Sequence, residues 1–278
     1  MNICLFSGQG NEKKIIFNNY SDKYFDIVKN NFKISKNQLI TGKYVFKNQI
    51  LSLINNVSNF DKLKIENIDF FQNIDTLVGY SLGEYSALVC GGVISFNECI
   101  RLIKFRSELM NKIGKKTNST LITILGINEK FLKTILGNIK YYIAIYLSED
   151  SHVLAVNIND LSTIVKKIKL MKRFNKIGLK ILHVDGGFHS PFMSDCIIEF
   201  KKYLDQVNLK HPKYNIISNV DGNFYQDINK IKKNLLLHLT SPLNWKNILS
   251  SLNIKKIYEL GGDSMKKTLE LNKINTKN

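Results

Sequence analysis

The sequence has no long hydrophobic run: among its 278 residues no stretch of 18 apolar residues occurs. A membrane-spanning helix is therefore not expected. The first residues, Met1 to Phe6, carry no basic leader and soon reach Gly8-Gln9-Gly10, so they predict a first strand and not a signal peptide. With 44% hydrophobic and 10% aromatic residues, the composition is that of a globular protein and not of a disordered one.

Cysteine and proline are both scarce. The four cysteines are scattered and show no C-x-x-C spacing: Cys4, Cys90, Cys99 and Cys196. This distribution argues against structural zinc and against a disulfide framework, and we expect a soluble protein of the reducing cytoplasm. Of the three prolines, Pro191 and Pro242 lie in segments that carry functional motifs.

Acidic residues are fewer than basic ones: the sequence contains 23 Asp and Glu and 40 Lys and Arg, which gives a net charge of +17. A basic surface attracts anionic partners such as nucleic acid, a nucleotide-bearing cofactor or an acidic protein. Clusters such as Lys166-Lys167 and Lys232-Lys233 are short, and few contain the aromatic residues that stack on bases, which argues against nucleic acid. The excess of basic residues has two remaining interpretations: compositional drift with solvated faces, or a surface for an anionic cofactor or protein.

Short apolar strands alternate with helical stretches, which predicts an α/β architecture. Residues 75–79 are typical of a short buried strand. Residues 82–89 are typical of a helix that Gly91-Gly92 would end.

A second helix is predicted from the Ser-x-x-Glu capping box at Ser95 to about Ile113, with Gly114 as its stop. Its apolar stripe repeats every 3.6 residues. The stripe consists of Cys99, Leu102, Ile103, Leu109, Met110 and Ile113. Arg106 lies on the same stripe, where a leucine would be expected.

The segment from residue 120 to residue 184 changes character. Its pattern predicts strand, helix, strand, strand, helix and strand at residues 121–127, 129–139, 142–147, 152–158, 160–174 and 179–184. This β-α-β-β-α-β order is that of the split ferredoxin-like unit. We therefore expect residues 118–184 to form a small domain inserted into a large α/β domain of residues 1–117 and 185–278.

Gly79-Tyr80-Ser81-Leu82-Gly83 fits the pattern G-x-S-x-G between a predicted strand and a predicted helix. The glycines permit a sharp turn that would hold the Ser81 hydroxyl at the helix N-terminus, where an N–H group and the helix dipole stabilise an oxyanion. A tight strand-to-helix turn without chemistry is the alternative, because the pattern is short.

A serine nucleophile needs a base. The five histidines are His152, His183, His189, His211 and His238. His189 is the strongest candidate because it lies in a turn-rich loop, residues 186–191, directly after a predicted strand. His183 is expected to pack within that strand, and His211 and His238 are interpreted as surface or helix residues.

Five ordered motifs extend along almost the whole chain. They are Gly8-Gln9-Gly10, Gly79-Tyr80-Ser81-Leu82-Gly83-Glu84-Tyr85-Ser86-Ala87, Arg106, Phe188-His189-Ser190-Pro191-Phe192-Met193 and Ser241-Pro242-Leu243-Asn244-Trp245. In this order they resemble the malonyl-CoA:acyl carrier protein transacylase family of fatty acid synthesis. They are even more similar to the free-standing (trans-acting) acyltransferases of polyketide synthases.

The resemblance implies a hydrolase-like α/β large domain with an inserted ferredoxin-like small domain. It also implies roles: Ser81 as nucleophile, His189 as base, and the backbone carbonyl of Asn244 to orient the histidine in place of a carboxylate. The backbone N–H groups of Gln9 and Leu82 would form the oxyanion hole.

By the same resemblance, Arg106, Phe188 and Met110 would bind substrate. A guanidinium is costly to bury without a partner, and its planar fork suits a carboxylate such as that of a malonyl group. Phe188 would disfavour an α-methyl branch. An Arg106 paired with a core Asp or Glu is the structural alternative.

The implied reaction is ping-pong: an acyl-CoA acylates Ser81, and the phosphopantetheine thiol of a carrier protein then takes the acyl group. The resemblance implies no metal or redox cofactor, an acidic carrier protein as partner, and a monomer. Three alternatives remain: a proofreading hydrolase of carrier-bound acyl groups, an unrelated α/β-hydrolase esterase, and a docking module without catalysis. The retained Arg106 argues against the first, and no convincing D-x-x-H context supports the second.

Overall fold

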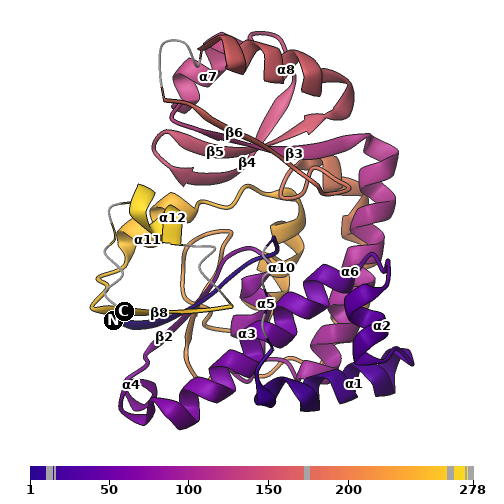
Figure 1. The fold of residues 1–278 in the computed structure, drawn as a ribbon, viewed down its shortest axis with the longest axis vertical. Helices are drawn as coiled ribbons and strands as arrows, with labels where there is room; N and C mark the ends of the chain where they lie inside the picture. Colours follow the sequence, from indigo (N-terminus) through magenta and orange to yellow (C-terminus); the bar gives the residue numbers. More distant parts are fainter. Residues whose placement is uncertain (11–14, 16, 172–175, 262–265, 273, 275–278) are drawn as a thin grey trace.

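The computed structural model describes residues 1–10, 15, 17–171, 176–261, 266–272 and 274. Two four-stranded sheets, one above the other in Figure 1, organise the chain. The mixed α/β architecture expected from the sequence is confirmed. Within the described ranges, no helix is both long and apolar enough to cross a membrane.

The first sheet is parallel throughout, in the order β7-β2-β1-β8. Its strands are β1 (Asn2–Phe6), β2 (Thr76–Gly79), β7 (Asn215–Ile217) and β8 (Lys256–Leu260). Strand β2 is central and every residue in it is buried, as its short apolar run predicts.

Alternate side chains of β1 enter two different cores, as the two-residue period of a strand requires. Cys4 and Phe6 belong to the first core, which lies between this sheet and the helices of the lower part. Ile3 and Leu5 belong to the second core, which lies between the two sheets.

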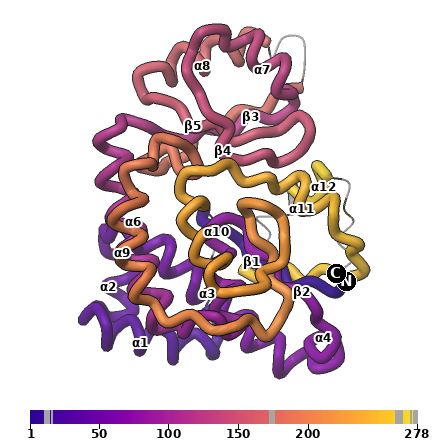
Figure 2. The backbone as a smooth tube through the Cα atoms, turned by 180° about the vertical axis from the view of Figure 1, so that it is seen from behind, coloured from indigo at the N-terminus to yellow at the C-terminus, as the bar shows by residue number. Residues whose placement is uncertain are grey.

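The helices around the first sheet come from both ends of the chain (Figures 1 and 2). They are α1 (Asp22–Phe32), α2 (Lys36–Thr41), α3 (Lys47–Glu66), α4 (Ile68–Gln72), α5 (Gly83–Cys90), α6 (Phe96–Thr117), α9 (Ile197–Asp205), α10 (Ile228–Thr240), α11 (Trp245–Ser251) and α12 (Lys266–Leu271), with two 3-10 turns, η2 (Asn19–Ser21) and η3 (Pro191–Cys196). Helices α6 and α9 contact each other along one side of the molecule (Figure 2).

The second sheet is antiparallel, in the order β4-β5-β3-β6. Its strands are β3 (Ser119–Leu125), β4 (Tyr141–Ser148), β5 (Ser151–Asn157) and β6 (Gly178–Leu182). Helices α7 (Glu129–Leu136) and α8 (Ile158–Met171) enclose a third core against it. The predicted order of elements is confirmed, although the end expected for the second helix, residues 172–174, lies outside the described residues.

Helix α6 connects the two sheets and is longer than the sequence predicts. It continues to Thr117 and ends at Asn118, whose left-handed φ of 49° closes it. The expected stop at Gly114 is wrong, because this glycine serves a close approach: a Cβ there would lie 1.7 Å from the Asp185 carbonyl oxygen. At the other end of α6, the Ser95 side chain accepts a hydrogen bond from the Glu98 N–H, as predicted. The Glu98 carboxylate accepts a hydrogen bond from the Ser95 hydroxyl and not, as in a full capping box, from the Ser95 N–H.

The contact between Gly114 and Asp185 predicts a large cost for any side chain at residue 114. Gly114→Ala should lower the free energy of unfolding by about 2 kcal/mol or more, because the methyl group displaces the segment that leads to His189. Urea unfolding measures this change. Lys115→Ala, an exposed change on the same turn, should stay within about 0.5 kcal/mol. If Gly114→Ala instead stabilises the protein, as alanine does in an unobstructed helix, the close approach does not exist.

Candidate active site

Ser81 sits on a strained turn between β2 and α5. Its φ is 51°, a left-handed conformation that non-glycine residues rarely adopt. The flanking glycines of the motif are required by space: a Cβ on Gly79 would lie 2.1 Å from the Gly83 carbonyl carbon, and one on Gly83 would lie 2.2 Å from the Phe6 carbonyl oxygen. The turn therefore presents the half-buried Ser81 side chain at the carboxyl end of the central strands.

His189 meets Ser81 from the loop after β6, as the sequence predicts. The Ser81 Oγ lies 2.8 Å from His189 Nε2, and His189 Nδ1 lies 2.6 Å from the backbone oxygen of His238. A carbonyl only accepts, so Nδ1 carries the proton and Nε2 accepts from the Ser81 hydroxyl. His189 is 3% exposed and has a left-handed φ of 56°.

The prediction that Asn244 supplies the orienting carbonyl is wrong. Asn244 caps the N-terminus of α11, where its side chain accepts the Asn247 N–H at 3.2 Å. The carbonyl that orients His189 belongs to His238, in the last turn of α10, where carbonyl groups have no partner within the helix. His238 is itself fully buried, so its interpretation as a helix residue holds and its interpretation as a surface residue does not.

Arg106 is a buried cation without an acidic partner among the described residues. It is 3% exposed, and its Nη1 donates to Gln49 Oε1 at 3.1 Å. Its guanidinium lies 5.3 Å from the centre of the Tyr85 ring. No ion pair within the described part of the chain includes Arg106, and its Nε has no hydrogen-bond partner there. The alternative of a pairing with a core carboxylate is therefore not observed among these residues.

The two other predicted substrate residues occupy different depths. Phe188 is half-buried next to His189 and packs against both the first and the second core. Met110 is fully buried in the first core, one helical turn beyond Arg106. Phe188 thus lies at the junction of the two sheets, whereas Met110 lies inside the lower part.

The predicted oxyanion donors, Leu82 and Gln9, belong to two neighbouring turns. Leu82 is the N-cap of α5, and no partner for its N–H occurs in the described ranges. Gly8, next to Gln9, lies against the motif, because a Cβ on Gly8 would be 2.8 Å from the Tyr80 carbonyl oxygen. The turn that carries Gln9 is therefore adjacent to the turn that carries Ser81.

Sequence reasoning missed a buried polar group behind Ser81. Asn219 Oδ1 accepts the Ser81 N–H at 2.9 Å, and its Nδ2 donates to the Gly79 carbonyl at 2.6 Å. The Asn219 N–H donates to Glu84, which also accepts from the Tyr225 hydroxyl. Glu84 was visible inside the serine motif, but nothing in the sequence marks Asn219 or Tyr225, which come from a distant loop.

Burial controls the ionisation of this site. Burial, together with the nearby positive charge of Arg106, lowers the pKa of His189 to about 3, against the opposing hydrogen bond to His238. It also lowers the pKa of the His238 ring, together with His189 and Arg106. Burial raises the pKa of Glu84 to about 7, although hydrogen bonds from Tyr225 and Asn219 act in the opposite direction. His189 is thus neutral at physiological pH and can accept a proton.

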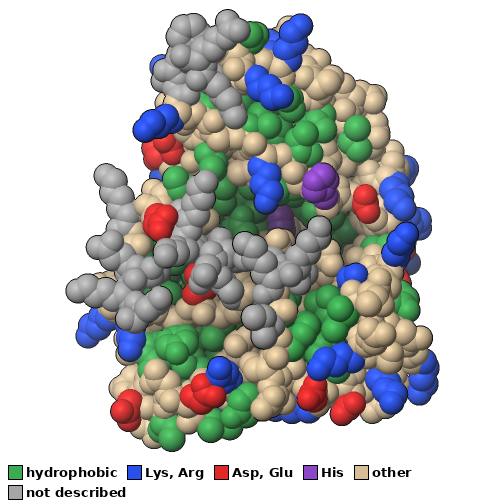
Figure 3. Space-filling view, viewed as in Figure 1, with side chains coloured by type: hydrophobic (Ala, Val, Ile, Leu, Met, Phe, Trp, Pro, Cys, Tyr) green, Lys and Arg blue, Asp and Glu red, His purple; other side chains and the backbone are tan. Residues whose placement is uncertain are grey.

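An open groove of about 580 Å³ leads to His189 from the side of the second sheet. It is lined by Glu129, Lys133, Gly137, Ile139, Lys140, Tyr141, Tyr142, Ile143, Tyr146, His189, Pro191, Thr240, Ser241 and Pro242. Figure 3 shows a hollow between the upper and lower parts of the molecule, with hydrophobic and histidine side chains inside it. An extended ligand can therefore reach His189 from solvent.

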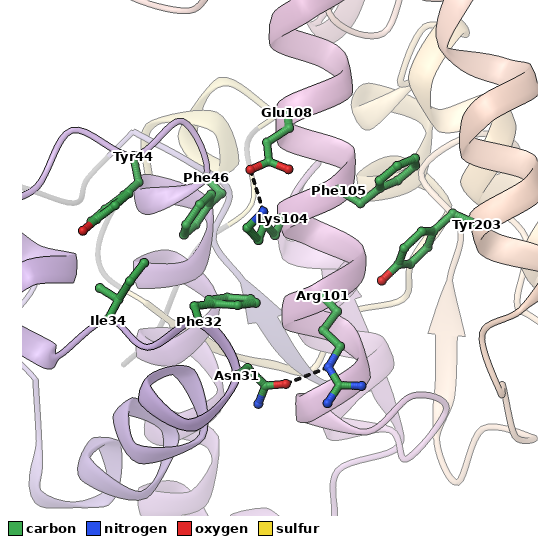
Figure 4. Close-up of a pocket in the computed structure, with 10 residues that line it drawn as sticks. All are labelled: Asn31, Phe32, Ile34, Tyr44, Phe46, Arg101, Lys104, Phe105, Glu108 and Tyr203. Atoms are coloured by element: carbon green, nitrogen blue, oxygen red, sulfur yellow. Dashed lines mark hydrogen bonds and ion pairs between the residues drawn. The ribbon is translucent and has the colours of Figure 1, made fainter.

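A second groove, of about 660 Å³, lies away from this site (Figure 4). It is lined by Asn31, Phe32, Ile34, Tyr44, Phe46, Arg101, Lys104, Phe105, Glu108 and Tyr203. Its cations are already engaged: Arg101 donates to Asn31 at 2.6 Å, and Lys104 pairs with Glu108 at 2.7 Å. None of Ser81, His189 and Arg106 lines this groove, so it is not part of the active site.

The sequence is similar to those of known proteins. Residues 51–228 match the family model described as acyl transferase domain. The malonyl CoA-acyl carrier protein transacylase of Buchnera aphidicola subsp. Schizaphis graminum is 27% identical over 286 residues, which cover 92% of this chain and 86% of that relative. Alignments with several further curated relatives cover only about half of the relative's length.

Solved structures share the fold. The malonyl-CoA:acyl carrier protein transacylase of Helicobacter pylori superposes with a TM-score of 0.85 at 22% identity, over 99% of this chain and 92% of that one. A malonyl-transacylase in complex with its type II polyketide synthase acyl-carrier protein superposes with a TM-score of 0.81 at 19% identity, over 97% and 92%. At these identities the likeness establishes the fold alone. Because the family model spans more than half of the sequence and includes Ser81, Arg106 and His189, the chain belongs to the acyl transferase domain family.

Proposed function

We propose that this chain is a malonyl-CoA:acyl carrier protein transacylase that carries the malonyl group on Ser81. The observation that carries the proposal is Arg106, a buried guanidinium without a carboxylate partner among the described residues, close enough to lower the pKa of His189. An uncompensated buried cation is costly, and a carboxylated acyl group would supply the missing anion.

In the first half-reaction, Ser81 Oγ attacks the carbonyl carbon of the malonyl thioester while His189 Nε2 takes the hydroxyl proton. The Leu82 and Gln9 N–H groups stabilise the oxyanion of the tetrahedral intermediate. The carbon–sulfur bond then breaks, His189 returns the proton to the departing CoA sulfur, and a malonyl ester remains on Ser81.

In the second half-reaction, His189 takes the proton from the phosphopantetheine thiol of the carrier protein, and the sulfur attacks the ester carbonyl. The carbon–oxygen bond to Ser81 breaks, and His189 gives the proton back to Ser81 Oγ. The His238 carbonyl holds the proton on Nδ1 throughout, so that Nε2 faces the serine in both halves. The cycle needs only the donor thioester, the acceptor thiol and this chain's own groups.

The acyl group is proposed to be malonyl because both of its ends find a partner. Its thioester end meets Ser81 and His189, and its free carboxylate meets the planar fork of Arg106, which Gln49 holds from the other side. Phe188, at the junction beside His189, would disfavour a methyl branch at the α-carbon.

The proposed acceptor is an acidic carrier protein. Support comes from the net charge of +17, from Lys133 and Lys140 in the groove that leads to His189, and from the similar transacylase that binds an acyl-carrier protein. We also propose a cytoplasmic monomer. The free state of all four cysteines suits a reducing compartment.

We infer that the fold is a hydrolase-like large domain, residues 1–117 and 185–278, with a ferredoxin-like insert at residues 118–184. The parallel order β7-β2-β1-β8 and the antiparallel order β4-β5-β3-β6 support this division. The active site would then lie between the two domains, with Ser81 and His189 both from the large one.

The acyl-enzyme predicts a mass change. Incubation with malonyl-CoA should add one malonyl mass to the intact protein, and Ser81→Ala should abolish the addition, because the ester oxygen is missing. Intact-protein mass spectrometry over a panel of acyl-CoAs measures this, and a carrier protein added afterwards should gain the group. Loss of the label to water without transfer would instead indicate the proofreading hydrolase, and a wild type that no CoA thioester labels would rule out transfer from CoA.

The proposed contact between Arg106 and the malonyl carboxylate predicts that removing Arg106 slows malonyl transfer and spares acetyl transfer. Arg106→Ala should cost about 3 kcal/mol or more in malonyl transfer while acetyl transfer remains, because only malonyl has a charge to pair. The ratio of kcat/KM for the two donors is the measurement. Arg101→Ala, an exposed arginine on the same helix, is the control and should change neither donor. Equal losses for both donors in Arg106→Ala would make Arg106 a structural residue.

The buried neutral His189 predicts a dependence of stability on pH. Its folded-state pKa lies below the ordinary 6.5, so below about pH 6.5 the unfolded chain binds a proton that the folded chain does not. This lowers the stability of the wild type by up to about 1.4 kcal/mol per pH unit as pH falls. His189→Gln lacks that loss, so its stability should decline less steeply from pH 6.5 to pH 5 in urea unfolding. Parallel declines would mean that His189 is protonated in the folded protein.

A further inference from the structure

Four buried polar residues lie directly behind Ser81 and His189, and the proposed reaction does not use their side chains. They are Glu84, Asn219, Tyr225 and His238. Each of them is at most 4% exposed. Polar groups at such depth cost stability unless they are paired, so their arrangement calls for a physical reason.

On the serine side, Asn219 holds the strained turn at both ends. Its Oδ1 accepts the Ser81 N–H at 2.9 Å, and its Nδ2 donates to the Gly79 carbonyl at 2.6 Å. Asn219 itself is held by Glu84, whose Oε2 accepts the Asn219 N–H at 3.1 Å. The Glu84 side chain therefore acts on the turn that orients the Ser81 hydroxyl through one intervening residue, Asn219.

On the histidine side, Glu84 Oε2, the oxygen that accepts the Asn219 N–H, lies 3.6 Å from His238 Nε2. The His238 backbone carbonyl fixes His189 Nδ1, and the rings of His238 and His189 pack edge to face with centroids 4.7 Å apart. The His238 ring nitrogens have no hydrogen-bond partner within the described ranges. The Glu84 carboxylate, 3.6 Å away, can therefore orient the His238 ring.

Glu84 is itself held firmly. Its Oε1 accepts the Tyr225 hydroxyl, so the carboxylate contacts one group from the loop after β7, one from residue 225 and one from α10. All three groups are far from Glu84 in the chain, 135 positions for Asn219 and 141 for Tyr225, and within the described ranges Glu84 makes polar contacts with Asn219, Tyr225 and His238.

We propose that Glu84 is a positioning residue that aligns Ser81 and His189 with each other, through Asn219 on one side and His238 on the other. Glu84 touches no reacting atom. Its effect is on the relative placement of the two groups, and a misplacement of about 1 Å is enough to slow such a reaction by about 100-fold. The inference takes the serine–histidine pair from the proposed function but does not depend on the identity of the acyl group.

The test is the rate at which Ser81 reacts with a small organophosphorus electrophile, a fluorophosphonate, followed by intact-protein mass spectrometry. Glu84→Gln keeps the side-chain volume and one carbonyl oxygen, and should lower the rate by about 10-fold. Asn219→Ala should lower it by about 100-fold. The double variant should lose much less than the product of the two, because both changes act on one turn. A loss equal to the product would overturn the link through Asn219.

Steady-state kinetics with malonyl-CoA provide a second readout. A positioning residue that does not contact substrate should lower kcat by about the factor seen in labelling and leave KM within about twofold. Tyr225→Phe removes a single oxygen atom from the cluster and should lower kcat several-fold with the fold intact. It keeps the test decisive if Glu84→Gln does not fold.

A matched pair of controls exists outside the Glu84 cluster. The Tyr24 hydroxyl donates to Asp61, which also pairs with Lys23 at 2.7 Å. Asp61→Asn and Tyr24→Phe make the same chemical changes as Glu84→Gln and Tyr225→Phe, and should leave labelling and kcat unchanged.

Two results with the variants would overturn the proposal: a folded Glu84→Gln with labelling within twofold of wild type, or equal losses in the Asp61→Asn control. A wild type in which Ser81 resists the fluorophosphonate would also overturn it, because no aligned pair would exist. If the wild type is labelled at Ser81 but transfers no malonyl group, the proposed function fails while the role of Glu84 is still decided by the labelling rates.

Discussion

The hydrogen bond between Ser81 Oγ and His189 Nε2 is the contact on which the rest of the site depends. Its two residues are 108 positions apart in the chain, and both have a left-handed backbone. The parallel strands position Ser81. The chain then passes through the long helix α6 and the second sheet before it returns to the first sheet, and this return brings His189 to Ser81. Gly114 makes this return possible because α6 and residue 185 touch backbone to backbone there.

Electrostatics separates this site from a simple serine–histidine pair. Burial and the Arg106 charge both keep His189 neutral, so it is ready to take a proton rather than already holding one. The same Arg106 charge has no carboxylate partner among the described residues, which makes the site better suited to an anionic acyl group than to a neutral one. One guanidinium thus lowers the pKa of the base and is also the group that we propose selects the acyl substrate.

Local patterns predicted much of the fold and three of the central side chains. The alternation of strands and helices between residues 120 and 184 was sufficient to predict the order of these elements along the chain. The position of an arginine on an apolar stripe was sufficient to mark Arg106. The His238 carbonyl could not be predicted, because backbone atoms carry no residue-specific signal and only the end of α10 exposes them. Asn219 likewise acts across 138 positions through tertiary contact alone.

The most direct test of the proposed acyl transfer is a crystal structure of the protein soaked with malonyl-CoA. We expect continuous density from Ser81 Oγ into a malonyl ester, its free carboxylate paired with both terminal nitrogens of Arg106 and its carbonyl oxygen near the Leu82 and Gln9 N–H groups. An ester on any other residue, or a malonyl carboxylate that points away from Arg106 into solvent, would contradict the central claim.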